Sequence, residues 1–473
     1  MVVAALLSAQ TGYVLAQDQS DELKRLKQQL QELDQKVRIL ERSKELEAEA
    51  ADAKAKTLPT VSIGTGGLSA TSGDSNFVMK IRGYVQADSR TFIGDETAKG
   101  NDTFGLRRVR PIIEGSVWKD FEYRLMMDFG SGITSGAGNN AFLQDGYMNF
   151  HHWDEAQLQV GKMKEPVGLE RLQSGRNMLF IERSLPTQLV PNRDVGVQLH
   201  GKLWGNTLAY QVGYFNGVED GGSGDIEVSD DGKDVAARIF AQPFDQTGIE
   251  PLKKFGLGVA VTHGIHVGAL RNYTTSGQQT WFKWRAGAGT TAAPNVTADG
   301  ATDRFVPQAW YYWGPFGVFG EYAISSHEVV LTAGAAPGQT SHQTFDNRAW
   351  QISASYFLTG EENSFGVVTP KRPFGFGPGS GWGAWEIAAR VGQLPVDDAV
   401  FRDRDAVAGP DFATDNSARE AREWGVGLNW HLNPNIKASV NYWHTDSKGG
   451  SKAKGEVTAQ DEEAIFARAQ FVF

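Results

Sequence analysis

The stretch "FVMKIRGYVQAD" (residues 77–88) alternates between apolar and polar side chains. Its odd-numbered positions hold Phe77, Met79, Ile81, Gly83, Val85 and Ala87, and its even-numbered positions include Lys80, Arg82, Tyr84, Gln86 and Asp88. Because successive side chains of a β-strand point to opposite faces, this period of two predicts a strand with one apolar and one charged face. The stretch decides the fold, because the same pattern recurs as far as the last residue of the chain.

We count sixteen strands of this kind in the sequence. They are predicted at 77–88, 104–118, 121–129, 142–150, 155–163, 194–202, 206–217, 233–242, 255–264, 304–313, 316–326, 346–358, 382–393, 422–432, 435–446 and 463–473. Tight links such as 119–120 and 314–315 alternate with long glycine-rich links such as 164–193 and 265–303, as in an up-and-down outer-membrane barrel. The link 359–381 is an exception, since it is long and falls on the short-turn side. We place 280–287 in a loop, because counting it would make the strand number odd.

The main competing architecture is a soluble β-sandwich or propeller, whose strands also alternate. Two features decide against it. Aromatic side chains gather at strand ends on the apolar face, for example Trp424 and Tyr442, as in a membrane-interface girdle. The chain also ends in "QFVF", with Phe473 on the apolar face. We therefore predict an all-β fold over 77–473: a 16-stranded antiparallel transmembrane barrel in a Gram-negative outer membrane, contacting its lipid and lipopolysaccharide.

The N-terminal region has a different pattern. Apolar residues recur in steps of three and four at Leu23, Leu26, Leu30, Leu33, Val37 and Leu40. This heptad seam predicts a periplasmic α-helical coiled coil over 18–56, although one amphipathic helix lying on its own domain would also fit. Residues 57–76 are rich in Gly, Ser and Thr and are expected to form a flexible linker. Residues 1–16 are interpreted as a signal-peptide remnant, with Val14 and Ala16 at the positions read by signal peptidase.

Composition argues against several classes of function. The 473-residue chain has no cysteine, which excludes disulfides and thiolate metal sites, and its net charge of −10 argues against nucleic acid as a partner. Its two adjacent histidines, His151 and His152, would point to opposite faces of a strand and could not chelate one ion. No local catalytic or cofactor motif stands out. We therefore expect no enzyme activity, no cofactor and no metal.

The stretch "LRRVRPII" (106–113) places three arginines in a predicted strand. Because an arginine or lysine facing lipid costs about 2–4 kcal/mol at the midplane, the charged faces must line the lumen. Arg108 and Arg110 share the parity of Glu114 and face inward. Arg107 has the other parity, so it is expected above the hydrocarbon or on a bulge near Pro111. The same argument makes Lys80, Arg82, Tyr84, Arg124 and Arg238 pore-lining residues.

Several segments resemble the phosphate- and polyphosphate-selective porins, the OprP/OprO family. They are "VGKMKEPVGLERLQSGRNMLFIERSLPTQLVPNRDVGVQLHG" (160–201), "RGYVQAD" (82–88), "FGLRRVR" (104–110), "LQDGYMNF" (143–150) and "FLTGE" (357–361). The resemblance covers essentially 77–473. It implies a homotrimer of sixteen-stranded channels whose third long loop folds into the lumen and forms the constriction. Some members carry an N-terminal coiled coil, which makes a trimeric coil plausible here.

Carried over by position, the resemblance implies a set of constriction residues. Arg107 and Arg108 would come from the wall with Asp145 as the carboxylate beside them, and Arg171, Ser174 and Arg183 would come from the loop. This register makes Arg107 lumenal, in contrast to its parity. The chain also departs from the family pattern: Tyr84 replaces an arginine, Arg110 and Lys164 replace aromatic rings, and Gly175 replaces a second hydroxyl. We include Arg110 and Lys164 among the anion-binding candidates.

The leading hypothesis is a passive channel for anions, with phosphate or polyphosphate as the expected solute and a broader preference for small anions as a variant. Rings of arginine or lysine select anions in pores. A general diffusion porin for small hydrophilic solutes, without a phosphate site, is the first alternative. In that case the arginines would pair with Glu114, Glu122, Asp128 and Asp145 and solvate the wall. A structural protein that tethers the membrane through its coil is the second alternative.

Overall fold

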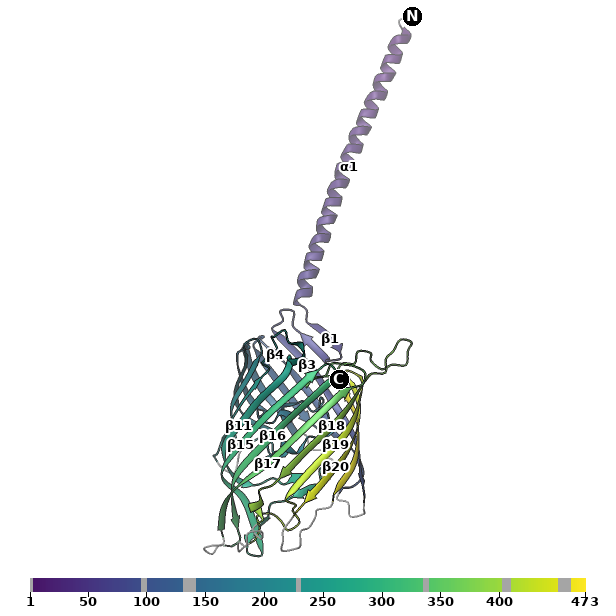
Figure 1. Cartoon of the computed structure of the whole chain (residues 1–473). Helices are drawn as coiled ribbons and strands as arrows, with labels where there is room; N and C mark the ends of the chain where they lie inside the picture. Colours follow the sequence, from purple (N-terminus) through teal and green to yellow (C-terminus); the bar gives the residue numbers. More distant parts are fainter. Residues whose placement is uncertain are drawn as a thin grey trace. The chain divides into compact units, whose positions relative to one another are not determined.

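The computed structural model describes residues 3–94, 100–130, 142–226, 231–334, 340–401, 410–449 and 461–473. The chain divides into two units, one formed by Met1–Thr60 with Thr71–Asn76 and the other by Val61–Ala70 with Phe77–Phe473. The second unit contains the β-barrel (Figure 1).

All sixteen predicted strands are present, and they form one closed antiparallel ring. The ring consists of β3 (Phe77–Ile93), β4 (Thr103–Val117), β5 (Phe121–Asp128), β6 (Phe142–Trp153), β7 (Ala156–Lys164), β8 (Arg193–Leu203), β9 (Leu208–Phe215), β10 (Asp234–Ala241), β11 (Lys254–Ala269), β15 (Ala293–Trp313), β16 (Phe316–Thr332), β17 (Thr340–Phe357), β18 (Ala384–Pro395), β19 (Glu420–Asn433), β20 (Ile436–Lys448) and β21 (Glu462–Val472). Each strand pairs with the next one in the ring, and β21 pairs with β3, so the barrel has no free edge. The predicted fold class is confirmed for this part of the chain.

Several strands extend further than the alternation predicted. β15 has 21 residues and β17 has 18, whereas crossing a membrane takes about 9–11. The predicted loop 265–303 is therefore shorter, running from the end of β11 at Ala269 to the start of β15 at Ala293. It contains β12 (Tyr273–Thr274), β13 (Thr280–Phe282) and β14 (Ala286–Thr290). β12 and β13 pair only with each other among the described strands, and β14 pairs with β15, so 280–287 adds no strand to the ring.

The two faces of the strands differ as the alternation predicts. On β19, Trp424 and Val426 are 43% and 47% exposed, whereas Glu423 and Asn429, which have the opposite parity and face the lumen, are 3% and 0% exposed. The apolar faces thus form the outer surface of the barrel, where lipid is the natural solvent. The long link after β17, from 358 to 383, lies on the side of the short turns as expected. Its Phe365 carbonyl accepts a hydrogen bond from Gln173 at 3.0 Å.

The N-terminal region contains the long helix α1 (Val3–Thr57). The helical part of the prediction for 18–56 is confirmed, and the six seam residues are 45–72% exposed in the single chain. Their pairing into a coiled coil stays a prediction, as do the processing of residues 1–16 and the division into domains. Among the described residues, no helix has the long apolar run that a membrane-crossing helix needs.

The predicted flexible linker, residues 57–76, contains two short strands. They are β1 (Thr60–Gly64) and β2 (Gly67–Thr71), which pair with each other, and β2 also pairs with β3. Gly67 has a φ of +93°, a left-handed conformation that suits glycine at the turn between them. Part of this stretch is therefore an ordered hairpin rather than a flexible chain.

Candidate functional site

The loop between β7 and β8, residues 165–192, lies inside the barrel. It contains α2 (Leu169–Leu172) and the short 3-10 helix η1 (Leu185–Gln188). Phe180 and Ile181 of the loop are each 1% exposed and share an apolar cluster with Trp443 and Phe466 of the wall. Burying a large apolar side chain contributes about 1.5–3 kcal/mol. A solvated loop would leave these side chains in water, so their burial explains why the loop folds inward.

Polar side chains of the wall bind the backbone of this loop. The Asn429 side chain donates to the Leu179 carbonyl at 2.9 Å, and the side-chain oxygen Oδ1 of Asn441 accepts from the Ile181 N–H at 2.7 Å. Further donors to loop carbonyls are Gln86, Gln308, Lys437, Arg468 and Gln470. These residues belong to β15, β19, β20, β21 and β3. The loop therefore rests mainly on that side of the barrel, although Arg107 of β4 and Lys164 of β7 also bind it.

Arg390 of β18 contacts the loop at three points. Its guanidinium forms an ion pair with Glu170 at 2.5 Å, and both side chains have no exposed area. It also donates to the Glu182 carbonyl at 3.0 Å and lies over the Phe180 ring, 4.5 Å from its centroid. A buried pair of this kind is costly to break, because removing one partner leaves a buried charge uncompensated.

Arg107 occupies a β-bulge in β4. Gln86 of β3 faces Arg108 while Ala87 faces Leu106, so Arg107 has no partner in the register. Because a bulge inserts one extra residue, Arg107 and Arg108 can both face the lumen although they are consecutive. The bulge thus lies at Arg107 itself, and not near Pro111 as predicted. The lumenal position of Arg107 agrees with the register implied by the family resemblance.

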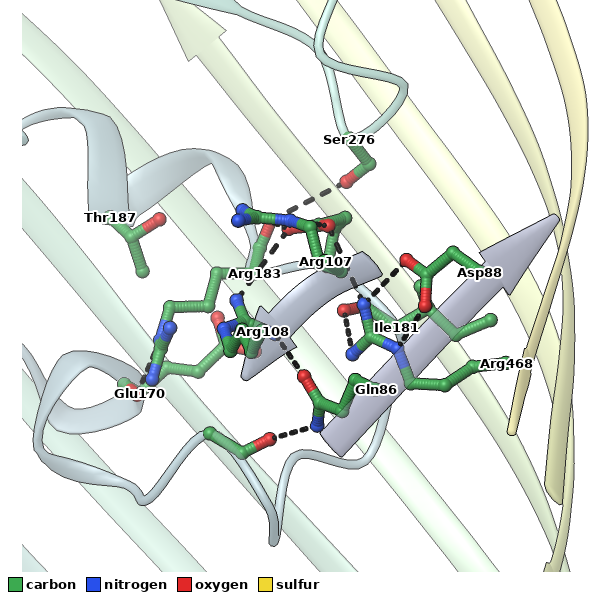
Figure 2. A network of polar contacts seen from close by, with 12 residues as sticks. Gln86, Asp88, Arg107, Arg108, Glu170, Ile181, Arg183, Thr187, Ser276 and Arg468 are labelled. Atoms are coloured by element: carbon green, nitrogen blue, oxygen red, sulfur yellow. Dashed lines mark hydrogen bonds and ion pairs between the residues drawn. The ribbon is translucent and has the colours of Figure 1, made fainter. Parts of the chain in front are cut away.

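Glu182 of the loop lies among arginines of the wall. Figure 2 shows Arg107, Arg108 and Arg468 of this network. Its carboxylate lies 2.6 Å from Arg107, 2.8 Å from Arg90, 3.7 Å from Arg468 and 3.9 Å from Arg108. Burial opposes ionisation of Glu182, but the charges of Arg107, Arg90 and Arg108 hold its pKa well below the usual value. Glu182 is therefore a carboxylate at neutral pH.

The resemblance implied that Asp145 is the carboxylate beside Arg107 and Arg108, and the structure corrects this. It forms ion pairs with Arg193 at 2.7 Å and Arg124 at 3.1 Å. The neighbouring carboxylate of Arg107 and Arg108 is Glu182, which comes from the loop. The physical reason for the correction is that the loop crosses the lumen and places its own acidic residue against the bulge.

Arg171 and Arg183 of the loop bind backbone carbonyls. Arg171 donates to Thr187 at 2.6 Å, and Arg183 donates to Gln173 at 2.9 Å and to Glu170 at 3.1 Å. Neither guanidinium forms an ion pair with a carboxylate in the described part of the chain. Burial lowers the pKa of Arg171 to about 9 and that of Arg183 to about 10, and neighbouring arginines add to both shifts. A cation in such surroundings gains strongly from an incoming anion.

Two hollows adjoin beside the loop. The outer hollow, on the side of the long loops, has a volume of about 960 Å³, and its charged lining residues are Arg90, Asp102, Arg107, Arg108, Arg171, Glu182, Arg183 and Arg271. The inner hollow has a volume of about 290 Å³ and is lined by Tyr84, Arg110, Arg124, Asp145, Lys164, Ser174, Gly175 and Arg193, among others. A Cβ atom placed on Gly175 would lie 3.5 Å from Nε of Arg108, so at this pair the lining of the inner hollow lies against the lining of the outer one.

The remaining wall arginines are mostly paired. Arg110 forms an ion pair with Asp128 at 2.6 Å and donates to the Tyr84 hydroxyl at 3.0 Å. Arg82 and Arg124 both bind Glu114, at 2.7 and 2.9 Å. The alternative that wall arginines pair with neighbouring carboxylates is therefore right for Arg82, Arg110 and Arg124.

The other predicted lining residues have different partners. Lys164 donates to the carbonyls of Leu172 and Gln173, and Arg238 donates to Gln308 at 3.0 Å and Gln211 at 3.2 Å. Lys80 is exposed near the short-turn end of β3. The structure thus brings together the candidates at 107, 108, 171 and 183 around the outer hollow, and those at 110, 145, 164 and 174 around the inner one.

Several residues of the two hollows and their ion-pair network were missing from the prediction. Arg90 has the parity of Arg82 but lies two residues beyond the predicted end of its strand, and Arg193 immediately precedes the predicted strand 194–202. Extending both strands would have found them. Arg468 lies on the polar face of the predicted strand 463–473, so parity places it in the lumen, but only the folded barrel brings it to the bulge. Glu182 carries no such local signal. No group of three or more histidine, aspartate or glutamate side chains in the described ranges is placed to hold a metal ion.

A closed barrel of sixteen antiparallel strands, apolar outside, charged inside and crossed by an inward loop, defines a porin of the bacterial outer membrane. The family model for the phosphate-selective porins O and P matches residues 79–473, and the chain belongs to this family. The resemblance inferred from the sequence motifs is therefore confirmed. A porin family is a family of channels, which fits the prediction that the chain is not an enzyme.

Individual relatives agree with this assignment. Porin O of Pseudomonas aeruginosa is 22% identical over 427 residues, which cover 86% of this chain and 91% of Porin O. Among solved structures, the outer membrane channel DcaP of Acinetobacter baumannii is similar with a TM-score of 0.52 and 12% identity, covering 85% of this chain and 98% of that one. This second likeness concerns the fold alone.

Proposed function

We propose that the protein is a passive anion channel that prefers phosphate or related oxyanions. One observation carries this proposal: six arginines line the outer hollow, against two carboxylates among the described residues. The chain as a whole has a net charge of −10, so the basic lining is a local property of the pore. Clefts lined by one sign of charge concentrate ions of the opposite sign.

The proposed path runs through both hollows and past a constriction between the loop and β4. An anion first meets Arg171 and Arg183, whose partners are backbone carbonyls, and then passes Arg108. Nε of Arg108 is buried without a hydrogen-bond partner, so this guanidinium keeps a donor for a ligand. Below it lie the Ser174 hydroxyl and the Lys164 ammonium. Planar guanidinium groups match the oxygens of phosphate better than they match a spherical chloride ion.

A general diffusion porin without a phosphate site is the second candidate. It is favoured by the pairing of Arg82, Arg110 and Arg124 with carboxylates, which neutralises much of the inner wall. Tyr84 also holds the place of a family arginine. In this case a wall whose arginines are paired with carboxylates would pass small hydrophilic solutes with little preference for anions.

Planar bilayer recordings separate the two candidates. With the purified protein in a potassium chloride gradient, we expect a reversal potential of the sign set by chloride, and millimolar phosphate should reduce the chloride current. Sulfate at equal ionic strength shows whether the inhibition is particular to phosphate or extends to related oxyanions. A cation-selective reversal potential without phosphate inhibition would contradict the proposal.

We also propose that the channel assembles as a homotrimer, with the seam of α1 joining the subunits in the periplasm. The exposed seam, from Leu23 at 57% to Leu40 at 62%, supports this, because apolar surface in heptad spacing favours association. The barrels would contact outer-membrane lipid and lipopolysaccharide through their apolar faces. Cross-linking in detergent should give trimers, and deletion of residues 18–56 should reduce their yield while the conductance of the channels that form stays unchanged. Monomers only from the full chain would contradict this arrangement.

A further inference from the structure

We propose that Glu182 is a built-in counter-anion of the pore: its carboxylate occupies the place that a permeating oxyanion would take among the arginines, and so limits how tightly that anion binds. This inference rests on the proposed anion channel. It goes further by naming the residue that sets the affinity and release of the anion.

The contacts of Glu182 resemble those of a bound oxyanion. Arg107 donates to both carboxylate oxygens, from Nε at 2.6 Å and from Nη2 at 3.1 Å, and Arg90 donates to one of them at 2.8 Å. Arginine also binds phosphate through bidentate contacts of this kind. Glu182 lines the outer hollow although it is only 2% exposed. An anion that enters the hollow must therefore compete with this carboxylate for the same donors.

The charges around the site are not balanced. Four arginines, at positions 90, 107, 108 and 468, surround two carboxylates, Asp88 and Glu182. Arg468 binds Asp88 through two contacts, at 2.6 and 2.7 Å, which occupies that carboxylate. Arg90, Arg107 and Arg108 are left to share the single charge of Glu182. If that charge is removed, Arg107 and Arg108 have no fixed counter-ion and Arg90 keeps only Asp88 at 3.9 Å, so the three guanidiniums should take an anion from solution.

The position of the loop does not depend on the Glu182 carboxylate. The Glu182 carbonyl accepts from Arg390, the preceding Ile181 N–H donates to Asn441, and the Ile181 carbonyl accepts from Arg468. These contacts involve the backbone of residues 181 and 182 and survive a change of the side chain. Removal of the charge should therefore alter anion binding more than it alters the path of the loop.

The test is phosphate inhibition of the chloride current through the full-length Glu182→Gln channel. Glutamine has nearly the same shape but no charge, so its hydrogen bonds with the arginines are weaker than those of the carboxylate. We expect the half-inhibiting phosphate concentration to fall about tenfold or more, which corresponds to about 1.4 kcal/mol or more. Asp220→Asn is the matched control: Asp220 is a buried carboxylate, 2.8 Å from Arg304, that lines neither hollow. It should leave the inhibition unchanged.

A second variant covers the case in which Glu182→Gln does not assemble. Glu182→Asp keeps the charge but shortens the side chain, so it should hold the arginines less well and lower the half-inhibiting concentration by a smaller factor. Unchanged or weaker inhibition in a correctly assembled Glu182 variant overturns the inference. When the unmodified channel is inhibited by phosphate, such a variant result refutes only the role of Glu182. A cation-selective unmodified channel without phosphate inhibition refutes the anion channel itself.

Discussion

Replacing Arg108 with alanine should remove most of the phosphate inhibition of the chloride current and reduce the anion selectivity of the channel. Arg108 is 3% exposed, stands where the linings of the two hollows lie against each other and keeps Nε free of partners. The loss of one charged hydrogen-bond donor, worth about 1.5–3 kcal/mol, should raise the half-inhibiting phosphate concentration about 10- to 100-fold. The measurements are a phosphate titration of the chloride current and the reversal potential in a potassium chloride gradient.

Arg183→Ala should act in the same direction, because the guanidinium of Arg183 is bound only to the carbonyls of Glu170 and Gln173 in the described structure. The matched control is Arg348→Ala, since Arg348 is an exposed arginine that lines neither hollow. It should leave inhibition and selectivity as they are. If neither Arg108→Ala nor Arg183→Ala changes selectivity, the assignment of the anion site is wrong.

Replacing Arg390 with alanine should release the loop from the wall. The variant leaves Glu170 buried without its ion-pair partner and removes a guanidinium stacked on Phe180, and breaking a buried pair costs about 3–5 kcal/mol. With the loop free to move away from β18, we expect a severalfold larger single-channel conductance and a loss of anion selectivity. Single-channel recording gives both quantities, and the temperature at which the barrel unfolds in electrophoresis reports the loss of stability.

The control for Arg390 is a second fully buried arginine. Arg304 is 0% exposed in its side chain and binds Asp220 and Asp234, but it has no hydrogen bond to loop 165–192 among the described contacts. Arg304→Ala should lower stability to a similar extent and leave the conductance close to that of the unmodified channel. An equal rise in conductance in both variants would mean that general loosening of the barrel, and not release of the loop, is responsible.

The alternation of side chains was sufficient to predict every strand of the ring, because lipid imposes an apolar outer face wherever a strand crosses the membrane. It failed at the outer strand ends. β15 begins at Ala293 rather than at 304, and its first residues, "APNVTADGAT", show no apolar alternation. Once a strand rises above the hydrocarbon, water replaces lipid and that requirement ends. The ordered hairpin in 57–76 was predicted as a linker for the same reason, because a hairpin outside the hydrocarbon needs no apolar face.

The site was only partly predictable. Parity placed Arg108 and Arg110 in the lumen, but it misplaced Arg107, because an inserted residue shifts the count at a point that sequence does not mark. The partnership of Glu182 with Arg90 and Arg107 spans 92 and 75 positions of the chain. Such a contact follows from the path of the loop across the lumen, and no local pattern encodes that path.

The mainly one-sided attachment of the loop has a practical consequence for redesign. Most of its supports come from β15–β21 and β3, with Arg390, Asn429 and Asn441 among them, while the inner hollow is lined mainly by β4–β9. On that second side, Arg107 of β4 and Lys164 of β7 also bind the loop. Other lumenal side chains of β4–β9 can therefore be exchanged to give the pore a new solute while the contacts that hold the loop in the lumen are kept.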